Sequence, residues 1–166
     1  MSSEILFNQG DYVVYPSHGV GVIEAIEVQT VADMELKLIV IAFNDDQMKL
    51  RLPIAKAKSS GLRLLSSLDA MEKALQALSV KTKTKKAMWS KRAQEYDMKI
   101  NSGDPLSICE VIRDLYKPAT EAAQSYSERQ MFESAVTRLC RELAIIENIE
   151  ERIAQVKVAG LLQRVA

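Results

Sequence analysis

A run of positive charge surrounds the only tryptophan of this 166-residue chain. Six cations and no acid lie within residues 81–92: Lys81, Lys83, Lys85, Lys86, Lys91 and Arg92. Such side chains neutralise phosphates and release counterions, which gives affinity for DNA of any sequence. An aromatic ring among them can stack on a base or wedge between base steps in a minor groove. The segment therefore indicates nucleic-acid binding, and its candidate contacts are Trp89, Lys85, Lys86, Lys91 and Arg92.

Two other interpretations of this segment stay open at this point. One is a solvated loop and helix face, which is the usual role of a charge run. The other concerns Trp89, Ala93, Tyr96 and Ile100, whose spacings of 4, 3 and 4 are typical of the buried stripe of a helix. Trp89 is then a core residue, or a partly packed one with an exposed edge.

Other chemistry is weakly indicated. The single histidine, His18, lies in a turn-like Pro-Ser-His-Gly stretch, and no third catalytic group or oxyanion hole is signalled. The two cysteines, Cys109 and Cys140, lie in separate helical patterns outside any Cys-x-x-Cys unit, which is typical of buried thiols in a reducing cytosol. The glycines at 19 and 21 lack a following helix and do not make a phosphate loop. We expect no enzyme activity, no metal and no cofactor.

The charge is unevenly distributed, although 22 basic and 22 acidic side chains cancel overall. Residues 1–60 carry 5 basic and 8 acidic groups, net −3. Residues 61–117 carry 11 and 7, net +4, and residues 118–166 carry 6 and 7, net −1. No apolar run approaches the ~20 residues of a membrane span, and the N-terminus does not resemble a signal peptide. The sequence thus predicts a cytoplasmic protein, not bound to a membrane, with its positive charge in the middle.

The first 64 residues have the pattern of a small β domain. Short β-rich runs are expected at 12–15, 19–28, 34–43, 48–52 and 62–64, with turn signals between them. In the fourth run, Met48, Leu50 and Leu52 alternate with Lys49 and Arg51, which predicts one apolar and one charged face. Pro53 ends that strand or marks it as an edge. Five short strands favour an antiparallel barrel of SH3 or Tudor type.

Residues 65–166 have a helical period instead. Helices are expected from a capping signal at Ser66 to about residue 79, over 84–101, from Asp104-Pro105 to just before Pro118, from a capping box at Ser127-x-x-Gln130, and over 150–162. The expected apolar face of the last helix is Ile153, Val156 and Leu161. The fold class is therefore α+β: a small barrel in residues 1–64, followed by a compact all-α bundle in residues 65–166.

Several motifs resemble those of one family. Phe7-x-x-Gly10-Asp11-x-Val13-Val14-Tyr15-Pro16-x-His18-Gly19-x-Gly21-x-Ile23-Glu24-Ala25-Ile26 is similar to the opening signature of the CarD (CdnL) family. Trp89-Ser90-Lys91-Arg92 resembles its DNA-contact segment, and the stretches at 111–116 and 127–131 resemble its helical-domain motifs. The resemblance covers essentially the whole chain. Transcription-repair coupling factors carry a domain similar to residues 1–64 of this chain. In those proteins a helicase motor follows that domain, whereas here a helical domain follows it.

The resemblance implies a partner for each domain. The Tudor-like domain is expected to bind the β subunit of bacterial RNA polymerase, partly by strand pairing, with Arg51, Lys49 and Pro53 at the contact. The helical domain is expected to sit on promoter DNA at the upstream edge of the melted bubble, largely independently of sequence. Trp89 would enter the minor groove there, beside Lys91 and Arg92. Gln29 departs from the basic residue that some members have after the second strand, which puts one polymerase contact in doubt.

These expectations describe a monomeric transcription regulator that binds polymerase and promoter together and stabilises the open complex. The rival is a stand-alone architectural DNA-binding protein, in which the barrel only supports the helices. The feature that discriminates between them is the strand around Arg51, because a polymerase partner needs an edge that can pair.

Overall fold

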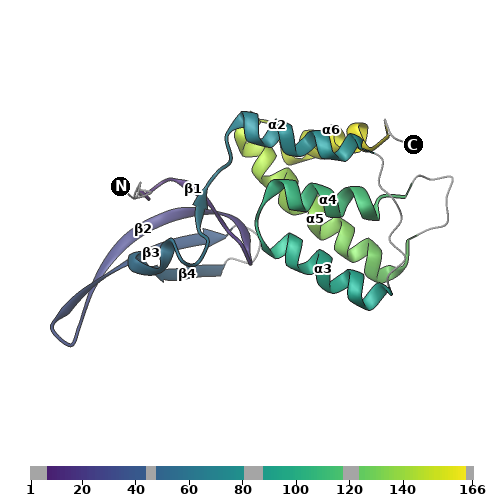
Figure 1. Cartoon of the computed structure of the whole chain (residues 1–166). Coiled ribbons are helices and arrows are strands. Elements are labelled where there is room, and N and C mark those ends of the chain that lie inside the picture. The colour runs from purple at the N-terminus through teal and green to yellow at the C-terminus, as the bar shows by residue number, and fades with distance from the viewer. Residues whose placement is uncertain (1–6, 44–47, 81–87, 118–123, 164–166) are drawn as a thin grey trace. The chain divides into compact units, whose positions relative to one another are not determined.

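The computed structural model describes residues 7–43, 48–80, 88–117 and 124–163. It divides the chain into two compact units, residues 1–65 and residues 66–166. The first unit is an antiparallel sheet and the second is helical, which confirms the predicted α+β class with a Tudor-like sheet domain (Figure 1). Two candidate DNA contacts, Lys85 and Lys86, lie outside the described residues.

In its described part, the first unit is built on five strands in the order β4-β3-β2-β1-β5. Their bounds are Tyr12–Tyr15 (β1), Gly19–Val31 (β2), Met34–Phe43 (β3), Met48–Pro53 (β4) and Arg63–Leu64 (β5). One inward face of the sheet makes the core, with a short helix, α1 (Ile54–Ala57), beside it: Val13, Ile23, Ile39, Ile41, Phe43, Leu52, Ala57 and Leu62. The alternation predicted for the fourth strand is confirmed, because Leu52 is buried while Lys49 and Arg51 are exposed.

Strands β2 and β3 extend beyond their neighbours as a two-stranded hairpin (Figure 1). They pair as far as Val31 and Met34, whereas β4 reaches only Leu38 on β3. The turn between them consists of Ala32 and Asp33, with φ angles of 51° and 64°. Two positive φ angles define the tight hairpin turn whose twist matches that of the strands. The predicted second strand, 19–28, is three residues too short because this turn lacks the glycine that usually signals it.

The second unit contains five α-helices and one 3₁₀ turn in its described part. Their bounds are Leu68–Gln76 (α2), Ala77–Ser79 (η1), Trp89–Asn101 (α3), Pro105–Leu115 (α4), Tyr126–Glu147 (α5) and Glu151–Gln163 (α6). Helix α4 contacts α2, α3 and α5, which places it at the centre of this unit (Figure 1). The buried core includes Tyr96, Ile112, Leu139, Leu143 and both cysteines.

Helix boundaries confirm some sequence predictions and correct others. Asp104 caps α4 as expected, accepting a hydrogen bond from the Leu106 N–H, and Gly103 adopts a φ of 73° after α3. The cap of α5 is Ser125, whose Oγ accepts from the Glu128 N–H; the predicted capping box at Ser127 is wrong by two residues. Glutamate in the first turn also suits the positive end of a helix, which favours the earlier box.

The predicted face of the last helix is wrong. Its buried residues are Ala154, Val158 and Leu162, while Ile153 and Val156 are exposed. Leu161 is only partly buried. The true stripe includes Ala154, which a pattern of large apolar residues does not mark. Close helix packing uses small residues as readily as large ones.

Candidate functional site

The tryptophan of the basic segment is the first residue of α3. Trp89 is partly buried and packs against the helical core, and its ring lies 6.3 Å from that of buried Tyr96. Met88 precedes it with a ψ of 145°, so the helix predicted over 84–101 begins later than expected. Trp89 is thus neither fully core nor fully exposed. A partly packed ring at a helix start is oriented by its contacts while an edge stays accessible.

The first turn of α3 has an unusual charge pattern. The side chain of its N-cap residue, Met88, makes no capping hydrogen bond, and the first turn contains Lys91 and Arg92 but no acid. The N-terminus of a helix carries a partial positive charge, so cations are disfavoured there and anions are attracted. Lys91 is exposed, whereas Arg92 is partly buried. An arrangement that costs stability in the free protein becomes favourable when a phosphate lies against it.

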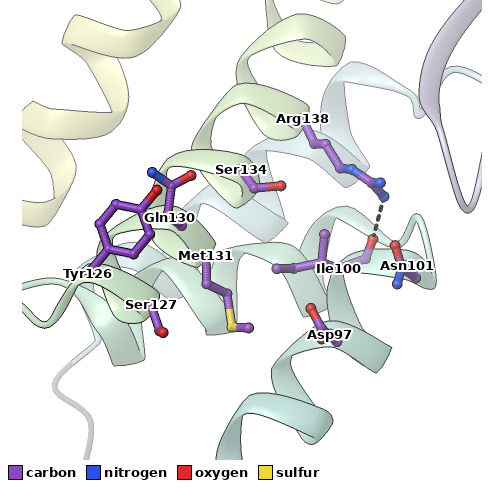
Figure 2. A pocket seen from close by; sticks show the side chains of 9 residues that line it. All are labelled: Asp97, Ile100, Asn101, Tyr126, Ser127, Gln130, Met131, Ser134 and Arg138. Carbon is purple, nitrogen blue, oxygen red and sulfur yellow. Dashed lines mark hydrogen bonds between the residues drawn. The ribbon is translucent and has the colours of Figure 1, made fainter.

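The rest of α3 is fastened to its neighbours. Lys99 Nζ lies 2.9 Å from Glu110 Oε2 on α4. At the C-terminal end, Arg138 reaches from α5, and its Nη1 donates a hydrogen bond of 3.2 Å to the Ile100 carbonyl (Figure 2). Burial lowers the pKa of the Arg138 guanidinium. These contacts hold α3 as a rigid support for Trp89 at its other end.

The same contact borders a shallow pocket between α3 and α5 (Figure 2). Its lining mixes polar and apolar side chains: Asp97, Ile100, Asn101, Tyr126, Ser127, Gln130, Met131, Ser134 and Arg138. Among the residues that the structure describes, no three histidine, cysteine or acidic side chains come together to hold a metal ion.

The candidate residues of the first unit lie on β4, an edge strand in the described sheet. Lys49 is opposite Ala42 and Arg51 is opposite Val40, so both point to the face away from the core. Each makes an ion pair with β2: Lys49 Nζ lies 3.1 Å from Glu24 Oε2, and Arg51 Nε lies 3.4 Å from Glu27 Oε2.

Those ion pairs are weak and exchangeable. The side chains of Arg51 and Glu27 are 54% and 39% exposed, and ion pairs this exposed contribute little to stability. Arg51 can therefore leave Glu27 for another partner at small cost. No sequence pattern marks Glu24 or Glu27 as an ion-pair partner of these cations. Their positions, facing the basic residues across β3, follow from the strand register, which the sequence did not supply.

Both thiols are buried within the helical unit. Burial raises the pKa of Cys109 to about 12, with nearby Asp104 as the next cause, and burial likewise raises the pKa of Cys140 to about 12. Each thiol is therefore protonated at neutral pH, and a protonated thiol is a poor nucleophile. Within the described ranges, no helix has the length and apolar character needed to cross a membrane.

Comparisons with known proteins agree with this architecture. Residues 7–66 match the family model described as "CarD-like/TRCF RID domain", and residues 73–159 match "CarD, C-terminal domain". The chain is similar to "Putative transcription factor YdeB" of Bacillus subtilis (strain 168), with 31% identity over 155 residues that cover 93% of this chain and all of that protein. The sheet domain and the helical domain are those of a transcription regulator. The chain belongs to the CarD family.

Proposed function

We propose that this regulator binds the RNA polymerase β subunit through residues 1–64 and promoter DNA through residues 65–166, and that it stabilises the open complex. On the first domain, β4 supplies the polymerase contact with Lys49, Arg51 and Pro53. On the second, Trp89 enters the minor groove at the upstream edge of the bubble. The surrounding cations hold the phosphates: Lys85, Lys86 and Lys91, with Arg92 beside the ring.

The observation that carries this proposal is the first turn of α3. It combines a partly packed tryptophan, an exposed lysine, no acid, and an N-cap residue, Met88, whose side chain makes no capping hydrogen bond. A helix that serves only as scaffold gains stability from a capping side chain and from acids at this end, and α2, α4 and α5 all have such a cap. The start of α3, where the side chain of the N-cap Met88 makes no capping hydrogen bond, differs from these three helices, and this favours a binding role for this end.

The physical logic is differential binding. A ligand shifts an equilibrium only by the difference in its affinity for the two states. A ring that wedges into an unstacked base step prefers the edge of a bubble to intact duplex. Modest DNA affinity suffices, because docking on polymerase raises the local concentration of the DNA-binding domain.

Reversing the charge of Arg51 is expected to weaken binding to the polymerase β subunit. Arg51→Glu places a carboxylate beside Glu27 on the outer face of the sheet, and the same change removes the cation offered to the partner. We expect at least a tenfold loss of affinity, or about 1.4 kcal/mol. Surface plasmon resonance on immobilised β subunit measures it, with the full chain in solution.

The control for this variant is Lys58→Glu, an exposed charge reversal after α1 and off the β4 edge. It should leave the affinity for the β subunit unchanged, and neither variant should change the affinity of the free protein for duplex DNA. Absence of β-subunit binding by the unaltered chain would favour the rival function, a stand-alone architectural DNA-binding protein.

The salt dependence of duplex binding is expected to be steep. Each phosphate contact contributes about −0.9 to the slope of log K against log salt concentration, so contacts from four of the six cations in residues 81–92 give about −3.6. Lys91→Ala should bring the slope about 0.9 closer to zero. Fluorescence anisotropy of a labelled duplex at several salt concentrations measures both. A slope near zero in the unaltered protein would mean that this charge run is only a solvated surface.

A further inference from the structure

Arg92 lies between two aromatic rings of its own helix. It follows Trp89 by three residues and precedes Tyr96 by four, which places the three side chains on one face of α3. The Arg92 Cζ atom is 5.6 Å from the centroid of each ring. Its Nη2 also donates a hydrogen bond of 3.2 Å to the Tyr96 hydroxyl oxygen. The guanidinium thus links the two rings.

One end of this cluster is anchored and the other is not. Tyr96 is 1% exposed and belongs to the helical core, whereas Trp89 is only partly buried. A contact that joins a fixed ring to a less constrained one restricts the less constrained one. The planar face of a guanidinium stacks on aromatic rings in a way that a lysine ammonium cannot reproduce.

The guanidinium is poorly placed to bind a phosphate. The Arg92 Nε atom is buried and has no hydrogen-bond partner in the described part of the chain. Bidentate recognition of a phosphate uses a fork of exposed N–H groups. To present a fork that includes Nε or Nη2, Arg92 would have to expose the first or break the bond of the second to Tyr96. Lys91, one residue earlier, is already exposed and needs no rearrangement to reach a phosphate.

We propose that Arg92 is a positioning residue, which holds the Trp89 indole against Tyr96 and does not itself contact phosphate. The proposal rests on the DNA-binding function proposed for Trp89, and it changes the role that the sequence assigns to Arg92. Arg92 fixes the ring before DNA arrives, so that little side-chain freedom is lost when the ring enters a groove.

The test uses the intrinsic fluorescence of Trp89. Because the chain has one tryptophan, the signal reports on this ring alone, and the measurement is made without DNA. In the full chain, Arg92→Ala and Arg92→Lys should both increase the acrylamide quenching rate and the local mobility seen by fluorescence anisotropy decay. Tyr96→Phe should have a smaller effect in the same direction, since it removes the hydrogen bond and keeps the ring. Lys91→Ala is the matched control and should leave the quenching rate as it is.

DNA titrations of the same variants separate the two roles. Arg92→Ala should weaken duplex binding while keeping the salt slope of the unaltered protein, whereas Lys91→Ala should bring that negative slope about 0.9 closer to zero. Unchanged quenching in Arg92→Lys, or a salt slope about 0.9 closer to zero in Arg92→Ala, would overturn the positioning role. The quenching result stands apart from the proposed function, because a failure of DNA binding in the unaltered protein would not alter it. Should Arg92→Ala lower the melting temperature, Arg92→Lys, which keeps the aliphatic stem and the charge, decides the question.

Discussion

Gly21→Ala is expected to destabilise the sheet domain by about 1–3 kcal/mol, the usual cost of forcing extra volume into a packed core. A Cβ atom at this position would lie 2.6 Å from Ile41 Cγ2 and 3.0 Å from two ring atoms of Phe43. Ile41 cannot yield easily, because it is fully buried and its branched side chain is stiff at χ1. The change therefore strains the core that orients β3 and, through it, β4.

The measurement is hydrogen exchange of β1 to β3 amides in the full chain, since Trp89 fluorescence reports only on the helical unit. Protection in the strands should fall while protection in α4 and α5 persists. Gly160→Ala is the matched control: nothing lies within 4 Å of a Cβ there, and the position is inside α6. It should raise stability by about 0.5–1 kcal/mol, because alanine favours helix over glycine. Equal protection in Gly21→Ala and in the unaltered protein would show that the core has room for the methyl group.

The fold class and most strands could be predicted because they follow from local patterns of apolar and polar residues. The alternation from Met48 to Leu52 is a direct record of one buried face, and it gave the right orientation for Lys49 and Arg51. The extra length of β2 could not be predicted, since the turn at Ala32 and Asp33 relies on positive φ angles that alanine rarely adopts. Aspartate adopts positive φ more readily, but without a glycine Asp33 is only a weak mark of such a turn.

In the helical unit, too, some features follow from the local sequence and others do not. Asp104-Pro105 is a strong local signal, and it predicts the start of α4 correctly. The buried stripe of α6 depends on which neighbours the helix meets, so the large apolar residues Ile153 and Val156 do not mark it. Tertiary contacts decide such a face, and a single sequence does not contain them explicitly.

The candidate site was only partly accessible to sequence reasoning. The spacing of Trp89 and Tyr96 predicted a shared helix face, which the contact between their rings confirms. The position of Arg92 between the two rings can be seen only from side-chain geometry. By residue type alone, an arginine in a basic run looks the same whether or not it contacts a phosphate. The roles of Trp89 in DNA and of Arg51 in polymerase binding stay predictions.

Trp89→Ala is expected to shorten the lifetime of the open promoter complex much more than it weakens binding to intact duplex. Unstacking a base step costs on the order of a few kcal/mol, so a wedge contributes most where the duplex is already distorted. Each 1.4 kcal/mol lost from the open state changes its stability about tenfold. Competitor-challenged lifetime assays with polymerase, promoter and the full chain measure this, and anisotropy on a duplex gives the comparison.

A structural role for Trp89 predicts a different pair of results. Removing a fully buried large aromatic side chain costs roughly 3–5 kcal/mol, and Tyr96→Ala, at 1% exposure, should show a loss of that order in thermal melting. Trp89 is only partly buried, so Trp89→Ala should melt closer to the unaltered protein than Tyr96→Ala does. Near-normal melting with a shortened lifetime supports the wedge. A loss of melting temperature as large as that of Tyr96→Ala would contradict it, because the loss of activity would then follow from the loss of structure.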